Sequence, residues 1–110
     1  MNEETLLAFN TFPEIETARR IAQQLVTENL TACANIIPSV ESIYQWQNKI
    51  ENSSETLVLF KTTAARYSAF QDRLKSLHPY EVPEILIVPV EASLPAYAAW
   101  IIGETTNVIS

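Results

Sequence analysis

The sequence is short of residue types that common functional sites require: its 110 residues include one glycine, one cysteine and one histidine. Phosphate-binding loops, dinucleotide-binding turns and nucleophile elbows each need several glycines, so the chain excludes these sites. A lone cysteine excludes an internal disulfide. The chain also lacks a CxxC pair, an HExxH motif and an EF-hand loop. These absences remove the usual nucleotide-phosphate cradle and the usual zinc and calcium signatures.

Basic residues are also scarce, because seven Lys and Arg stand against thirteen Asp and Glu, which gives a net charge of −6. Arg19-Arg20 is the only basic doublet. An acidic chain without a basic stripe does not suit nucleic acid or an anionic membrane surface. The same charge is compatible with cationic ligands, including metal ions.

The chain has no apolar run that approaches the roughly 20 residues needed to span a bilayer. Its first residues, Met1-Asn2-Glu3-Glu4, are acidic, and no secretory signal precedes the first expected strand. A single cysteine is typical of a reducing compartment. We therefore expect a globular, cytoplasmic protein with one domain over residues 1–110 and with no nucleic-acid or membrane partner.

Hydrophobic periodicity predicts four strands and three helices. Alternating or continuous apolar runs predict strands at 5–12, 32–47, 50–62 and 84–90. Apolar residues at helical spacing predict helices at about 14–29, 63–78 and 93–101. Residues 105–110 are expected to form a tail or a short added strand. The order is the ferredoxin-like β-α-β-β-α-β sandwich, an α+β fold, with a long hairpin between the second and third strands and an extra C-terminal helix.

Proline, asparagine and hydroxyl residues predict the boundaries of these elements. Pro38 lacks a backbone N–H, which predicts a bulge or an edge position in the second strand. Asn48 tolerates a positive φ and is expected in the tight turn of the hairpin. Thr63 and Ser93 are expected to cap the second and third helices. Because Pro79 pushes His78 out of the helical region, the second helix must end there.

Two of the expected strands are apolar at both odd and even positions: Leu57-Val58-Leu59-Phe60 and Ile85-Leu86-Ile87-Val88. Strands of this kind are buried on both faces of their sheet. In a ferredoxin-like sandwich the helices cover one face, and the last helix is too short to cover the other. We therefore expect self-association through sheet faces or strand edges.

Five segments of the chain form a recognisable series. They are Ala32-Cys33-Ala34-Asn35-Ile36-Ile37-Pro38, Tyr44-Gln45-Trp46, Glu55 with Lys61-Thr62, His78-Pro79-Tyr80-Glu81-Val82-Pro83-Glu84-Ile85, and Tyr97 with Trp100. Taken together and in order, these segments resemble the CutA family of divalent-cation tolerance proteins, and the resemblance runs from about Leu6 to Trp100. One departure is Asn48 in the hairpin turn, where the family usually has glycine. A second is Gln45, where an aromatic residue is common.

The resemblance implies a ferredoxin-like protomer in a tight homotrimer, with long hairpin arms that reach across to neighbouring subunits. It also implies a link to copper and other divalent cations, and a protein that is not an enzyme. The fold and trimer are similar to those of the PII signalling proteins, which bind small ligands between subunits. A small-molecule sensor with an organic ligand in the inter-subunit cleft is therefore the alternative function.

Four residues are candidate metal ligands: Cys33, His78, Glu81 and Glu84. An imidazole and a thiolate suit copper or zinc, and the two carboxylates could add oxygen ligands. One Cys and one His per chain leave the site incomplete, so carboxylates, water or a second subunit must complete it. The alternatives are that Cys33 is a small buried strand residue and that the two glutamates belong to a solvated turn.

Three further residues, Asn35, Lys61 and Tyr80, are candidates for a ligand cleft. If the Lys61 ammonium is buried, Glu81 or Glu84 is its expected partner; otherwise the side chain reaches the rim. We expect no organic cofactor.

Tyr44 and Trp46 lie on the protruding hairpin and are expected to anchor an interface, with the indole buried against its own chain or a neighbour. A catalytic Cys33–His78 pair is disfavoured, because no oxyanion hole and no group that orients the histidine is evident.

Overall fold

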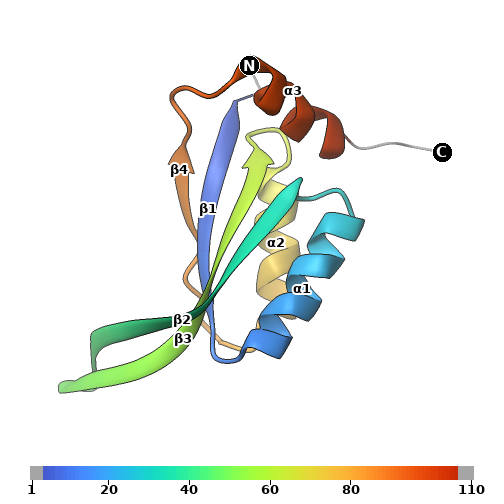
Figure 1. The fold of residues 1–110 in the computed structure, drawn as a ribbon. Coiled ribbons are helices and arrows are strands. Elements are labelled where there is room, and N and C mark those ends of the chain that lie inside the picture. The colour runs from blue at the N-terminus through green and yellow to red at the C-terminus, as the bar shows by residue number, and fades with distance from the viewer. Residues whose placement is uncertain (1–3, 107–110) are drawn as a thin grey trace.

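The computed structural model describes residues 4–106 and confirms the α+β, ferredoxin-like order with an added helix (Figure 1). Its four strands form one antiparallel sheet in the order β2-β3-β1-β4. No helix within residues 4–106 combines the length and the apolar character that crossing a membrane demands. The elements are β1 (Thr5–Phe12), α1 (Ile15–Thr27), β2 (Cys33–Trp46), β3 (Lys49–Thr63), α2 (Tyr67–Leu77), β4 (Leu86–Pro89) and α3 (Pro95–Glu104).

The core lies between the sheet and the two helices α1 and α2, which cover the same face (Figure 1). Even-numbered residues of β1 and β3 point toward these helices, as the period of two in a strand requires. The rings of Phe60 and Phe70 meet edge to face with centroids 5.2 Å apart. The fully buried apolar residues of this core include Ala8, Phe12, Ile21, Leu25, Val58, Phe60, Phe70 and Leu74.

The opposite side of the sheet, here called the open face, is also apolar. Helix α3 contacts β1 and β3 on this side, at the end of the sheet where Lys61 meets Tyr97. Leu86 keeps 59% of its surface exposed and Val88 keeps 46%. The expected apolar character of both faces is therefore confirmed, and a large apolar area remains uncovered in the single chain. The open face consists of Leu7, Phe9, Ile37, Leu57, Leu59, Leu86 and Val88.

The hairpin of β2 and β3 extends well beyond the body of the sheet (Figure 1). β1 pairs with β3 no farther than Thr56. Within residues 4–106, residues 40–55, here called the arm, therefore have only each other as strand neighbours. The turn at its tip has positive φ at Gln47 (51°) and Asn48 (66°), the pattern of a type I′ hairpin turn. Asn48 was predicted there, whereas Gln47 was not.

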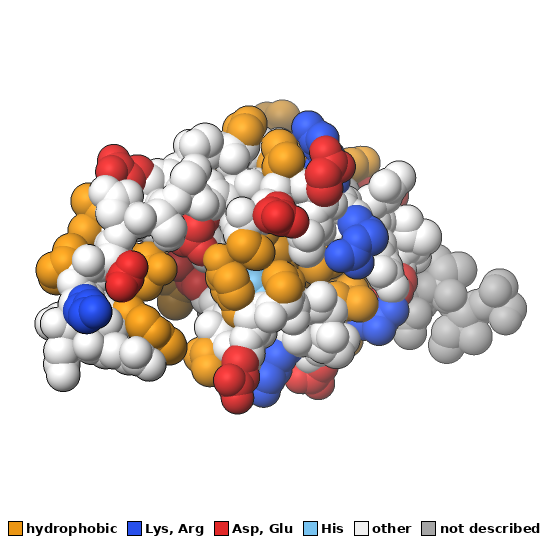
Figure 2. All heavy atoms as spheres, turned by 90° about the horizontal axis from the view of Figure 1, so that it is seen from below, with side chains coloured by type: hydrophobic (Ala, Val, Ile, Leu, Met, Phe, Trp, Pro, Cys, Tyr) orange, Lys and Arg blue, Asp and Glu red, His pale blue; other side chains and the backbone are white. Residues whose placement is uncertain are grey.

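The bulge predicted at Pro38 is present, because the register of β2 against β3 shifts between Ile37 and Val40. The arm carries apolar side chains on both of its faces, since Tyr44 and Trp46 alternate with Ile43, and Ile50 lies opposite Gln45. All four side chains are exposed, and Figure 2 shows hydrophobic groups along the arm at its left.

Both predicted helix caps are wrong. Thr63 remains in β3, paired with Thr5, and α2 begins only after a turn, with Arg66 as its N-cap. Ser93 does not cap α3, whose N-cap is Leu94 with no side-chain hydrogen bond, although Pro95 occupies the first turn as expected.

The last strand is also shorter than predicted, because β4 begins at Leu86 rather than at 84. The carbonyl of Glu84 instead accepts a hydrogen bond from the side-chain amide of Asn10. The tail or strand expected at 105–110 lies mostly outside the described residues, within which Thr105 is the C-cap of α3.

Candidate functional site

His78 ends helix α2, as the proline after it predicts. Its backbone is extended (φ −73°, ψ 139°), and its N–H still closes the last helical turn on the Leu74 carbonyl at 2.9 Å. The imidazole is 8% exposed. It stacks on Phe12 with centroids 4.5 Å apart and lies 4.9 Å from the Tyr80 ring. Figure 2 shows the imidazole as a small pale-blue area among hydrophobic side chains.

Both ring nitrogens of His78 are hydrogen-bonded. The backbone N–H of Tyr80 can only donate, so Nδ1, 3.0 Å away, must be unprotonated. The carbonyl of Thr11 can only accept, so Nε2, at 2.8 Å, carries the proton. His78 is therefore a neutral imidazole, and burial lowers its pKa below the usual value. No ring lone pair remains for a metal ion unless one of these hydrogen bonds breaks.

We expect stability to fall as the pH is lowered below about 6.5, where the unfolded histidine gains a proton that folded His78 resists. Because the pKa of His78 is lower in the folded chain than in the unfolded chain, its contribution to the free energy of unfolding is complete above the unfolded pKa. That contribution is lost as the pH falls toward the folded pKa. The slope is at most about 1.4 kcal/mol per pH unit. Urea unfolding at about pH 7.5 and about pH 5.5 measures it. His78→Asn should show a smaller decline, and an equal decline would contradict a neutral imidazole.

The four predicted metal ligands do not come together within one chain. No group of three or more His, Cys, Asp or Glu within residues 4–106 is placed to hold an ion. Cys33 pairs across the sheet with Lys61, and Lys61 with Leu7, whereas His78 contacts Thr11. Leu7, which is level with Cys33, and Thr11, which contacts His78, are four residues apart along β1, a distance of about 13 Å. A metal site that contains both Cys33 and His78 is therefore not formed by one chain, and only a site between copies stays a prediction.

Two carboxylates approach each other where the arm leaves the sheet. The hydroxyl of Tyr80 donates to Oε2 of Glu55 at 2.6 Å. Partial burial, and then the negative charge of Glu55, raise the pKa of Glu84 above its usual value. Burial and the same carboxylate raise the pKa of Tyr80. Glu55 was not predicted as part of this group, although the sequence shows this carboxylate just before the apolar run of the third expected strand. Glu81 is exposed and has no side-chain hydrogen bond within residues 4–106.

Lys61 lies at the other end of β3, on the same side of the sheet as the open face. Its ammonium donates to the hydroxyl of Tyr97 at 3.1 Å and lies 5.5 Å from the centroid of that ring. The Tyr97 and Trp100 rings stack with centroids 5.5 Å apart. The contact between Lys61 and Tyr97 is exposed, which fits the alternative of a side chain that reaches the rim. Neither Glu81 nor Glu84 forms an ion pair with Lys61 among residues 4–106.

The three residues predicted to line a ligand cleft do not lie together in the single chain. Asn35 and Lys61 share the open-face side, where the Sγ of Cys33 lies 3.7 Å from Oδ1 of Asn35. Tyr80 instead binds Glu55, six residues along β3 from Lys61, about 20 Å away. The sequence contained Tyr97 and Trp100, but their spacing on α3 predicted only a helix stripe, so their role beside Lys61 was missed.

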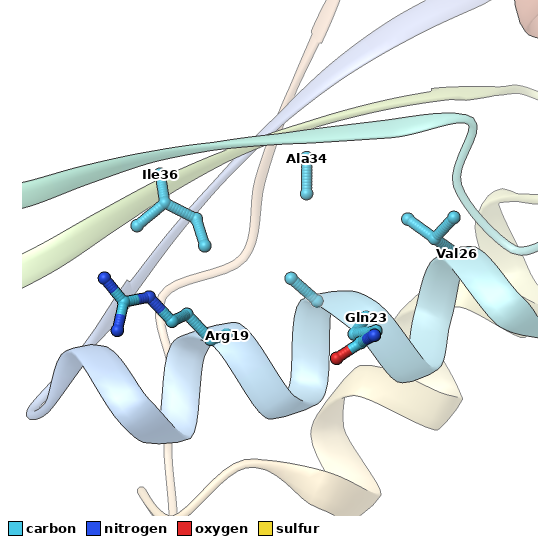
Figure 3. Close-up of a pocket in the computed structure, with 6 residues that line it drawn as sticks. Arg19, Gln23, Val26, Ala34 and Ile36 are labelled. Carbon is cyan, nitrogen blue, oxygen red and sulfur yellow. The ribbon is translucent and has the colours of Figure 1, made fainter.

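A shallow hollow of 390 Å³ lies between α1 and the free edge of β2, lined by Arg19, Ala22, Gln23, Val26, Ala34 and Ile36 (Figure 3). Arg19 is its only charged residue, and the guanidinium already donates to Glu16 at 2.9 Å. The lining holds no nucleophile, no carboxylate and no metal ligand. We therefore assign no chemistry to this hollow.

The fold matches solved structures closely. CutA from Xylella fastidiosa superposes with a TM-score of 0.91 at 41% identity, covering 94% of this chain and 99% of that chain. CutA1 from Oryza sativa gives 0.92 at 30% identity, covering 97% and 98%. The divalent-cation tolerance protein CutA of Thermus thermophilus is 43% identical over 99 residues, which are 90% of this chain and 94% of that protein.

Mammalian relatives are longer. Protein CutA of Mus musculus is 42% identical over 101 residues, which are 92% of this chain but 57% of that protein. The chain thus spans little more than half the length of the vertebrate and plant relatives it matches and nearly all of the Thermus relative. Residues 6–104 match the CutA1 divalent ion tolerance protein family. This match covers nine-tenths of the sequence, so the chain belongs to the CutA1 divalent ion tolerance protein family.

Proposed function

We propose that this chain is a homotrimeric, non-enzymatic protein that binds copper or another divalent cation between its subunits and serves the cellular response to metal ions in the cytoplasm. Family membership supports the link to divalent cations, which the names of several relatives state. A free thiol at Cys33 suits a reducing compartment.

The observation that carries the proposal is the apolar open face, which the single chain leaves uncovered, together with the exposed apolar side chains of the arm. Apolar surface of this extent is unusual on a monomer and is typical of an interface. The arm has exposed apolar side chains on both of its faces, so one neighbouring copy could cover only part of it. A closed ring, in which each arm touches a neighbour and each open face turns inward, covers both surfaces.

The metal is proposed to lie at a subunit boundary, because one chain alone supplies no group of three ligands within residues 4–106. The thiol of Cys33 is half-buried on the open-face side, where a second copy would approach. Glu84 has a raised pKa beside Glu55, and a cation relieves repulsion of this kind. His78, with both nitrogens engaged, is a ligand only if its contact with Thr11 or Tyr80 breaks.

The absence of catalysis is proposed from the same geometry. A Cys–His nucleophilic pair needs the two side chains in contact. Cys33 and His78 lie near opposite ends of β1, and both ring nitrogens of the histidine are already hydrogen-bonded. Among residues 4–106, His78 is therefore not placed to activate the thiol of Cys33.

Light scattering and copper calorimetry test the proposal. We expect a particle of three 12.4 kDa chains, about 37 kDa, at micromolar concentration. We expect Cu²⁺ to bind in a fixed ratio per trimer and to bind at least about tenfold more weakly after Cys33→Ser or Glu84→Gln. Affinity should also fall as the pH is lowered, because the ligands must lose their protons.

Glu91→Gln is the matched control, since it removes one exposed carboxylate from the loop before α3 and should leave affinity unchanged. A stable 12.4 kDa monomer would contradict the assembly. Copper binding that only His78→Ala abolishes would reveal an isolated histidine rather than a shared site, because copper binds almost any exposed imidazole.

A further inference from the structure

Lys61 carries a positive charge that no carboxylate neutralises within residues 4–106. The two ion pairs of this part of the chain are Arg19–Glu16 and Arg73–Glu28. Lys61 is a residue of intermediate exposure, and no carboxylate among residues 4–106 lies within 4.0 Å of its ammonium. Its one side-chain partner is the neutral phenol of Tyr97.

The groups around Lys61 are rich in donors and poor in acceptors. An ammonium has three N–H donors, of which Tyr97 accepts one. The Tyr97 hydroxyl that accepts this bond keeps its own proton to donate. The indole N–H of Trp100 has no acceptor among residues 4–106. An acceptor with negative charge is the group that these donors would bind most strongly.

The position of Lys61 on the sheet adds a second argument. Its side chain lies on the same side of β3 as the apolar residues Leu57 and Leu59, the side that the proposed assembly covers. Covering an unpaired ammonium costs more free energy than covering one that is paired with an anion. Assembly therefore favours an anion at this place.

We propose that Lys61, Tyr97 and Trp100 form a binding site for a small organic anion, a carboxylate or phosphate that carries an aromatic ring. The ammonium and the phenol hydroxyl hold the anionic group, and the stacked Tyr97–Trp100 pair offers an aromatic surface to the ring. The exposed amide of Asn35, on the same side of the sheet, is within the region that the ligand would reach. This site goes beyond the proposed cation binding and does not need a metal.

Calorimetry on the whole chain, with EDTA present, separates this site from metal binding. The probes are phenyl phosphate, benzoate, acetate, inorganic phosphate and phenol. We expect phenyl phosphate to bind at least about tenfold more tightly than either inorganic phosphate or phenol, since only it engages both the ammonium and the rings. Benzoate should bind and acetate should not, which tests whether a carboxylate replaces the phosphate.

Two variants and one control assign the binding. Lys61→Met should weaken phenyl phosphate about 10- to 100-fold, and Tyr97→Phe about tenfold, as expected for hydrogen bonds to a charged group. Lys75→Met removes an exposed lysine from the last turn of α2 and should leave binding unchanged. Equal binding by wild type and by Lys61→Met would overturn the proposal, and so would the absence of heat with every probe.

The melting temperature without ligand distinguishes an anion site from an ion pair with a second copy. If a carboxylate of a neighbouring subunit meets Lys61, Lys61→Met leaves that carboxylate unpaired and lowers the melting temperature. In the proposed site, the substitution removes an unpaired ammonium, so the melting temperature stays equal or rises. A lower melting temperature in Lys61→Met would therefore contradict the proposal, even if anions bind weakly.

Discussion

Trp46→Ala is expected to weaken assembly by about 3 kcal/mol per subunit, which is more than a hundredfold in each association step. The indole is 61% exposed in the single chain, so the expectation that its own chain buries it is wrong. A neighbouring copy is the partner that we expect to bury it. A large aromatic side chain that fills a pocket on a partner is the commonest type of interface anchor.

A dilution series followed by light scattering and thermal melting measures this effect. Wild type should stay at one mass over the series, whereas Trp46→Ala should dissociate on dilution and melt at a temperature that depends on protein concentration. Trp46→Phe retains an aromatic ring and should behave much closer to wild type. If Trp46→Ala keeps the wild-type mass and melting curve at every dilution, the indole faces water in the assembly, and the arm is not an anchor.

The order of elements was predictable because each signal was local. The alternation in residues 5–12 and the helical spacing in 14–29 need no distant partner to be recognised, and Pro79 ends α2 through its own ring. The bulge at Pro38 and the turn at Asn48 followed from backbone constraints of single residues. Predictions of this kind succeed because tertiary contacts reinforce them.

The helix caps failed for the opposite reason. Thr63 has a side chain suited to an N-cap, but its backbone pairs with Thr5 at the end of the β1–β3 ladder. Leaving the ladder would expose backbone groups that the sheet satisfies, so the strand persists to Thr63 and the helix starts four residues later. Sequence alone cannot weigh these two choices.

The site residues were identified as unusual, but their contacts were not predictable. The Nε2 proton of His78 goes to the carbonyl of Thr11, 67 residues away, and the hydroxyl of Tyr80 goes to Glu55, 25 residues away. Composition identified the only histidine as a candidate metal ligand, and that role stays a prediction. Its hydrogen bonds in the single chain link the end of α2 to the end of β1 and could not be read from the sequence.

Val88→Asp is expected to dissociate the proposed trimer into 12.4 kDa chains without unfolding them. Val88 lies opposite Leu7 on the edge strand β4, on the open face of the sheet, and is 46% exposed in the single chain. A carboxylate there stays in water in the single chain. In a covered interface it would be buried without a partner, which costs about 3–5 kcal/mol.

Far-UV circular dichroism separates dissociation from unfolding, because the single chain should keep its helices and strands while light scattering reports the smaller mass. Val82→Asp is the matched control: it introduces the same charge at a loop residue that is 87% exposed and lies outside the strands of the sheet. That variant should remain a trimer. If Val88→Asp also keeps the trimer mass, the open face is not the interface, and the arm alone must hold the copies together.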